Sequence, residues 1–142
     1  MPRWLRVQQQ RIMNKQIYLR PMTFSRYDAK RCLVYLNEEV IENHVPADAP
    51  EDFKPVTAYA YSGSESDGGT LIDAADDSRD SLVNGIIRSR YSQSEEDAIK
   101  THQIELLKNA DIDKAEDYEA EWVEFNTFRE KAKVTVDGWL KP

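Results

Sequence analysis

The chain has 142 residues and a formal net charge of −7, and 32% of its residues are charged. This length suits one domain, or a small domain with an appendage, and the low mean hydropathy predicts a modest hydrophobic core. These totals favour an extended or oligomeric protein over a compact monomeric enzyme. The single cysteine, Cys32, excludes an intrachain disulfide and agrees with a reducing compartment. No apolar run is long enough for a membrane helix or a signal peptide, so we expect a protein that is used in solution.

Positive charge gathers at the N-terminal end. Residues 1–27 contain six bases and no acid, which leaves thirteen bases and twenty-six acids for the rest of the chain. An acidic body repels nucleic-acid phosphates, so nucleic-acid binding by the body is disfavoured. We predict that residues 1–15 form a basic arm that is disordered or ordered by a partner. The arm has three interpretations: a solvated tail, a segment that docks on an acidic surface, or a nucleic-acid contact through Arg3, Arg6 and Arg11. Met13 and Met22 are, with Met1, the candidates for the translation start.

Residues 16–74 have the pattern of a β-rich part. Residues 16–20 alternate polar and apolar side chains and end at Pro21, which predicts an edge strand. Two further β-favouring runs, 31–36 and 39–42, flank the short turn Asn37-Glu38 and predict a hairpin. A helix over residues 27–42 is the alternative, because Leu33, Leu36 and Val40 also match a helical face.

A second hairpin is predicted after a proline-punctuated loop over residues 46–55. Residues 56–61 alternate strictly, with Val56, Ala58 and Ala60 on one face of the predicted strand. Residues 62–69 form a polar turn region, from which residues 70–72 return as a short partner strand. The expected fold class is therefore α+β, in which N-terminal β-hairpins form a small antiparallel sheet.

Residues 75–142 are predicted to be helical. Asp76-Asp77-Ser78 supplies caps for a helix whose inward side chains are Leu82, Val83, Ile86, Ile87 and Tyr91. Gly85 inside it either weakens the helix or marks close packing. Ser92 and Glu95 form a capping box that opens a second helix to about Lys108. We expect Ile99, Leu106 and Leu107 to point inward from that helix.

A third and longest helix is predicted from Asp113 to Trp139. Its apolar positions repeat at steps of three and four residues: Ala115, Tyr118, Trp122, Phe125, Ala132, Val136 and Trp139. Asp113 with Glu116 is the expected N-terminal cap, and Gly138 is the expected stop. Consecutive helices on a short link lie antiparallel, so we expect a C-terminal helical hairpin braced by the helix over 78–90.

The candidate functional residues are the aromatic side chains of the longest helix: Tyr118, Trp122, Phe125, Phe128 and Trp139. One interpretation is core packing against the preceding helices. The other is an interface for a second copy or a larger assembly, because Phe128 and Trp139 widen the apolar face beyond what one short helix covers.

Catalytic and metal sites find little support in the sequence. Cys32 with His44 or His102 lacks a third orienting residue, and its apolar surroundings favour an inert core cysteine. Asp67, Asp73, Asp76 and Asp77 are acids near turns, for which capping and turn formation are the simpler interpretation over weak cation binding. We expect no enzyme, no cofactor and no metal.

The segment around Ile86–Tyr91, Gly-Ile-Ile-Arg-Ser-Arg-Tyr-Ser, resembles small proteins encoded in phage and prophage tail modules, particularly of gut anaerobes. In those proteins an Ile-Ile-Arg-x-x-Tyr-Ser-x-x-x-Glu run opens a helical hairpin. Segments similar to Val56–Gly63 and Asp67–Leu71 precede that run. A helix similar to Tyr118–Asn126 and a Trp-Leu pair similar to Trp139-Leu140 follow it.

The resemblance extends to the helical hairpin of tail-fibre-associated and tail-assembly proteins of other phages. It implies a virion structural or assembly protein without catalysis, found in the virion or the host cytoplasm. The implied partners are other virion or tail proteins, or further copies of this chain as a homo-oligomer. No ligand or active-site residue is carried over. A host cytosolic adaptor or regulatory module, which would use the same aromatic surface, is the alternative hypothesis.

Overall fold

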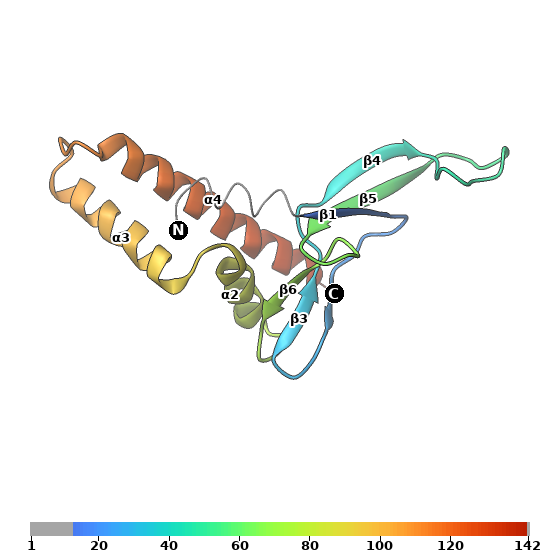
Figure 1. Ribbon diagram of the computed structural model, residues 1–142, viewed down its shortest axis with the longest axis horizontal. Coiled ribbons are helices and arrows are strands. Elements are labelled where there is room, and N and C mark those ends of the chain that lie inside the picture. Colours follow the sequence, from blue (N-terminus) through green and yellow to red (C-terminus); the bar gives the residue numbers. More distant parts are fainter. Residues whose placement is uncertain (1–12, 142) are drawn as a thin grey trace. The chain divides into compact units, whose positions relative to one another are not determined.

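The computed structural model describes residues 13–141, and within that range six strands precede three helices (Figure 1). The α+β class predicted from the sequence is confirmed. The predicted basic arm lies almost wholly outside the described residues. Contacts divide the chain into two compact units, residues 1–71 and residues 72–142, so the first unit holds most of the β structure and the second the helices. Among the described residues no helix has the length and apolar character needed to cross a bilayer.

The larger part of the first unit is an antiparallel sheet with the strand order β1-β5-β4. Its strands are β1 (Asn14–Tyr18), β5 (Val56–Gly63) and β4 (Glu39–His44). Ile17 lies opposite Ala60 in the β1–β5 pair, and Ile41 lies opposite Ala58 in the β4–β5 pair. β1 is at an edge of the sheet, as its alternation and the following Pro21 predict.

The second sheet has the order β2-β3-β6, with strands β2 (Phe24–Arg26), β3 (Arg31–Val34) and β6 (Thr70–Asp73). The alternative of a helix over residues 27–42 is wrong, since both predicted runs in it are strands. The predicted strand pairing is also wrong: β3 and β4 belong to different sheets, and so do β5 and β6.

The physical reason lies in the turn between β3 and β4. Asn37 has a φ of 59°, in the left-handed region that asparagine tolerates better than most residues. A type I′ hairpin turn needs a positive φ at both of its central residues, and Asn37 has one whereas Glu38 does not. The chain therefore passes from the sheet of β3 to the sheet of β4 here. The hairpins that do form are β2–β3 and β4–β5. In the β2–β3 turn, Oδ1 of Asp28 accepts hydrogen bonds from the backbone N–H groups of Lys30 and Arg31.

The second unit consists of α2 (Arg79–Arg90), α3 (Gln93–Lys108) and α4 (Ala115–Trp139). Both α2 and α3 pack against α4 (Figure 1). Tyr91 contacts Phe125, while His102, further along the chain, stacks on Tyr118, which precedes Phe125. Tyr91 directly precedes α3, so contacts that run in opposite order along the chain show that α3 and α4 are antiparallel. The predicted hairpin and its bracing helix are confirmed.

Two predicted helix starts are also confirmed. The Ser78 side chain accepts a hydrogen bond from the N–H of Ser81, and Ser92 and Glu95 form a complete capping box. Gly85 marks close packing, because a Cβ there would lie 2.5 Å from the carbonyl oxygen of Asp73.

The ends of α4 differ from the prediction. The helix begins at Ala115, and its N-cap residue is Lys114, which makes no capping hydrogen bond with its side chain. Asp113 is therefore not the cap. Gly138 lies inside the helix, which ends at Trp139. The C-cap residue Leu140 has a φ of −89°, a conformation that needs no glycine.

Candidate functional site

The five predicted interaction residues all lie on α4, and they differ in how much of each side chain reaches solvent. Phe125 is 1% exposed and belongs to the core of the helical unit. The other four are half-buried: Tyr118, Trp122, Phe128 and Trp139. The core interpretation therefore holds for Phe125, whereas part of each remaining side chain is open to a partner.

The C-terminal end of α2 holds the middle of α4. The ring of Tyr91 meets Phe125 edge-on with 5.1 Å between centroids, and it meets Phe128 at 5.8 Å. The guanidinium of Arg90 lies 5.0 Å from the centroid of the Phe128 ring, within the range of a cation–π contact. Nη2 of Arg90 also donates a hydrogen bond to Glu124 at 2.8 Å. These contacts orient the rings of Phe125 and Phe128 against the C-terminal end of α2.

Nearer its N-terminus, α4 is held by α3. The imidazole of His102 stacks on the ring of Tyr118 with a centroid distance of 4.0 Å and an interplanar angle of 4°. Nδ1 of His102 is hydrogen-bonded to Glu121 one turn along α4. The ring centroids of Trp122 and Phe125 lie 6.3 Å apart. His102 is thus part of the contact between α3 and α4.

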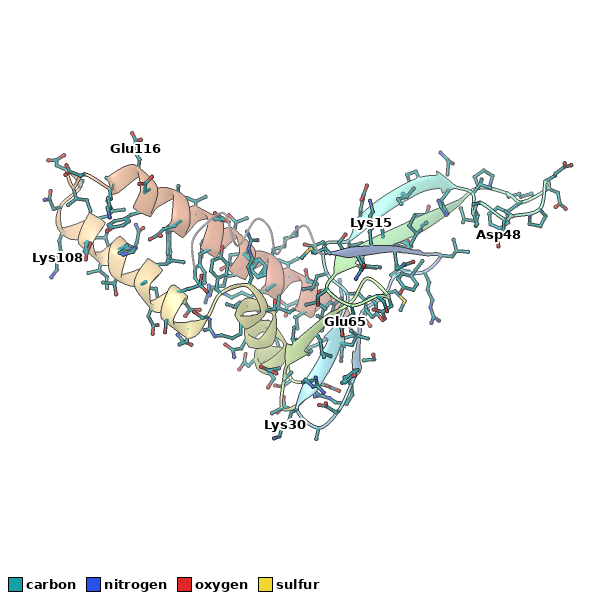
Figure 2. All side chains as sticks on the ribbon, in the orientation of Figure 1. Lys15, Lys30, Asp48, Glu65, Lys108 and Glu116 are labelled. Atoms are coloured by element: carbon teal, nitrogen blue, oxygen red, sulfur yellow. The ribbon has the colours of Figure 1, made fainter. Side chains whose placement is uncertain are left out.

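The sequence prediction missed a pair of exposed aliphatic residues on α3. Leu107 is 80% exposed and Ile104 is 54% exposed, and residues three apart on a helix are surface neighbours. The prediction that Leu107 points inward is wrong, whereas Ile99 is buried and Leu106 is half-buried. Adjacent residues on a helix point about 100° apart, so periodicity alone did not decide whether Leu107 lies inside or outside the buried stripe. Figure 2 shows Lys108, which follows Leu107, near the end of the hairpin where α3 leads into α4.

The residues of the Ile-Ile-Arg-x-x-Tyr-Ser-x-x-x-Glu run build the corner between α2 and α3. Ile86 and Ile87 are buried. Nη1 of Arg88 donates to the carbonyl oxygen of Tyr91 at 3.2 Å, and its Nη2 donates to Glu96 at 2.9 Å. Lys100 donates to the second oxygen of Glu96 at 2.6 Å. The spacing of this run is therefore a requirement of the fold, because it closes the corner with a carboxylate held between two cations.

Glu96 is 7% exposed, and burial by itself would raise its pKa. The hydrogen bonds from Lys100 and Arg88 outweigh burial, so the pKa lies below the ordinary glutamate value. Glu96 therefore stays ionised at neutral pH. A carboxylate that is already satisfied by two cations stabilises the corner and offers no free base for catalysis.

A second polar cluster, in the first unit, surrounds Asp67 and was not foreseen from the sequence. The Tyr35 hydroxyl donates to Oδ2 of Asp67 at 2.7 Å, and the N–H of Gly69 donates to Oδ1 at 3.0 Å. The Tyr18 hydroxyl donates to the backbone carbonyl of Asp67. Asp67 thus ties the polar turn over residues 62–69 to the sheet. Gly68 beside it has a φ of 83°, which favours glycine in this turn.

The tyrosine rings of this cluster pack on one another. Centroids of Tyr18, Tyr35 and Tyr61 lie 5.8 to 6.2 Å apart. Tyr61 donates its hydroxyl hydrogen to Glu38 at 2.9 Å and accepts a hydrogen bond from the backbone N–H of Met22 at 2.9 Å. The sequence showed the alternation of Tyr59 and Tyr61 but not the partners, which are distant along the chain.

Burial raises the pKa of each of the three hydroxyls. For Tyr35, burial and then the hydrogen bond to Asp67 raise the pKa well above its usual range. For Tyr61, burial and Glu38 raise the pKa to about 12, although the N–H of Met22 acts in the opposite direction. Burial and then the charge of Asp67 raise the pKa of Tyr18. These hydroxyls are protonated donors at neutral pH, so the cluster supports structure.

The remaining sequence candidates are placed as follows. Cys32 is 0% exposed in β3, and its thiol donates to the carbonyl oxygen of Ser25 at 3.3 Å, which agrees with a core cysteine. Asp76 accepts a hydrogen bond from the N–H of Ser78, as expected of a residue beside a helix start. Within residues 13–141 no group of three or more His, Cys, Asp or Glu side chains could hold a metal ion.

No known protein family, curated protein or solved structure matches this chain.

Proposed function

We propose that the protein is a structural or assembly component of a phage or prophage tail, connected with the tail itself or its fibres. It acts by docking onto other proteins of the particle. The sequence resemblance described above motivates the biological setting. The observation that carries docking is the pair Ile104 and Leu107, two large aliphatic side chains that are 54% and 80% exposed on the helical hairpin.

A protein partner would bury the apolar side chains that the small hydrophobic core leaves exposed. Complete burial of one leucine or isoleucine side chain contributes about 1.5–3 kcal/mol relative to leaving it exposed. The half-buried rings of Tyr118 and Trp122 on α4 would add area of the kind that is enriched at interfaces. Packing of α4 on α2 and α3 holds these side chains in place before binding, which lowers the conformational cost of docking.

The test is incorporation of variants into particles. A phage or prophage whose copy of the gene is deleted is complemented with the double variant Ile104→Glu/Leu107→Glu, and purified particles are analysed by mass spectrometry. Because two carboxylates would have to be desolvated in the interface, we expect the variant to be lost from the particles and the particle titre to fall. Circular dichroism of the purified variant checks that the helices still form.

The matched control is Ser94→Glu/Thr101→Glu on the same helix, where both side chains are already polar and exposed and the charge changes by the same amount. We expect this control to be incorporated like the original chain. Equal incorporation of all forms would contradict docking through α3. If particles never contain the chain, and the Ile104/Leu107 variant loses a host cytosolic partner instead, the adaptor hypothesis replaces this one.

A further inference from the structure

One face of the β1-β5-β4 sheet is apolar and partly uncovered. Residues directly opposite in antiparallel strands share a face, so Ile17 and Ile41 lie on the face of Ala60 and Ala58. Val56 lies on this face too, because side chains alternate along β5. The small alanines at the centre are buried, whereas Ile17 is 45% exposed and Val56 is 37% exposed. The centre of the face is therefore covered, whereas Ile17 and Val56 at its margins remain accessible to apolar side chains from another segment.

The β4 side of this sheet carries an excess of negative charge. Residues 32–53 contain six acids and neither Lys nor Arg. These acids are all exposed: Glu38, Glu39, Glu42, Asp48, Glu51 and Asp52. Glu39 forms an ion pair with Lys15 at 2.7 Å. Within residues 13–141 the other five have no ion pair, so their charges are available to a cationic segment. Figure 2 shows Lys15 on β1 and Asp48 in the loop that follows β4.

We propose that residues 1–12 bind this face and the β4 side of the sheet within the same chain. The segment has the required chemistry: three arginines and no acid, together with the apolar side chains of Trp4, Leu5, Val7 and Ile12. The arginines meet the carboxylates that have no ion pair within residues 13–141, and the apolar side chains cover Ile17 and Val56.

The point at which the segment joins the sheet makes the contact possible. Asn14 pairs with Gly63 and Glu39 pairs with Ala60, so the chain enters the sheet at the end where β4 begins. β1 and β4 are two strand spacings apart, or about 10 Å. A segment of this length can span up to about 40 Å, enough to reach along β4. Being joined to the sheet gives the segment a high effective concentration there, which favours its own sheet over that of a second copy.

Paramagnetic broadening in NMR spectra of the full chain tests the contact. A nitroxide is attached to a Pro2→Cys variant; Cys32 is 0% exposed and is not labelled. At low salt we expect amide signals of β4 and residues 45–52 to lose most of their intensity. High salt should restore the signals, because screening weakens contacts between exposed charges.

Two charge reversals sharpen the test. Glu42→Lys/Asp48→Lys should abolish the broadening of β4. The matched control Glu116→Lys/Glu119→Lys changes the net charge equally, at exposed residues of α4 that have no ion pair within residues 13–141, and should leave the broadening of β4 intact. Equal loss in both variants, or no broadening of β4 at all, would overturn the proposal.

A mixed sample identifies whose segment binds. It combines nitroxide-labelled chain without isotope and isotope-labelled chain without nitroxide, so that broadening can only arise between copies. The proposal expects no broadening of β4 in this sample. Broadening of the same strength as in the doubly labelled chain would assign the contact to a second copy and overturn binding within one chain.

Discussion

The two units of this protein build their cores by different means. In the first unit, hydrogen bonds join tyrosine hydroxyls to carboxylates that are distant in the sequence, such as Tyr35 to Asp67 and Tyr61 to Glu38. In the helical unit, aliphatic and phenylalanine side chains fill the core, and short-range caps and ion pairs such as Arg88 to Glu96 fix the corners. The first core therefore depends on long-range polar contacts, and the second on local pattern and apolar burial.

The largest effect should follow removal of the apolar centre of the helical unit. Phe125→Ala leaves a cavity beside Tyr91 and should cost about 3–5 kcal/mol of unfolding free energy. Denaturant unfolding followed by circular dichroism measures the loss. The control is Val134→Ala on the same helix, which is 70% exposed and should cost far less. Equal effects of the two changes would contradict a core centred on Phe125.

Two glycines provide a comparison within the helical unit. Gly85→Ala places a Cβ 2.5 Å from the carbonyl oxygen of Asp73, and overpacking of this kind costs about 1–3 kcal/mol. At Gly138 a Cβ meets nothing within 4 Å, so Gly138→Ala should stabilise the helix by about 0.5–1 kcal/mol. Thermal unfolding distinguishes the opposite signs. Stabilisation by both substitutions would show that α2 is not held closely against Asp73.

The polar core of the first unit should be sensitive to alkaline pH. Unfolded tyrosines ionise near pH 10, at about the ordinary tyrosine pKa. Because the folded pKa values are raised, the stabilisation is complete below that pH and is lost as the pH rises through the folded values, about 12 for Tyr61. Unfolding followed by the ultraviolet absorbance of tyrosinate measures this loss. Tyr61→Phe should reduce the alkaline loss, and an unchanged pH profile in that variant would count against the assignment.

Asp67 tests the same cluster without a change of pH. Asp67→Asn leaves one acceptor oxygen where the Tyr35 hydroxyl and the N–H of Gly69 each bind a carboxylate oxygen. The hydrogen bond from one buried donor is therefore weakened, which should lower the free energy of unfolding by about 1–3 kcal/mol. Denaturant midpoints measure the cost. Asp48→Asn, in an exposed loop of the same unit, is the control and should change little.

The smallest effect should come from acid. The folded pKa of Glu96 is lowered, so its stabilisation is present above the ordinary glutamate value of 4.5 and is lost as the pH falls through the folded value. Glu96→Gln should flatten this part of the dependence of the melting temperature on pH. Glu116→Gln, at an exposed residue of α4, should not. A profile that Glu96→Gln leaves unaltered would show that other acids govern the acid response.

The difference between the two units also explains which parts of the fold could be predicted from the sequence. Helix positions, the Ser92–Glu95 capping box and the buried faces of α2 and α4 follow from spacings of three and four residues, so they were predictable. Five of the six strands were predictable as well, but β2 was missed. Strand partners were not predictable, because the chain changes sheets between β3 and β4 and alternation does not identify a partner. The tyrosine cluster shares this limit, since its hydroxyls bind residues far along the chain.

The candidate interaction surface was predictable only in part. Periodicity placed Phe125 and its neighbours on one face of α4, but the core of the unit covers that face in part. Ile104 and Leu107, a pair of neighbouring exposed side chains, lie on α3, and the sequence pattern assigned one of them to the interior. Which apolar residues remain exposed depends on the packing of α3 against α4, which no local spacing determines.

We propose above all that another protein of the particle covers the helical hairpin. An electron cryomicroscopy map of the purified tail, from a phage or induced prophage that encodes this chain, tests that claim most directly. Our account predicts density for α3 and α4 with Ile104 and Leu107 covered by a neighbouring protein. A map that contains the chain with both side chains bare to solvent would contradict it.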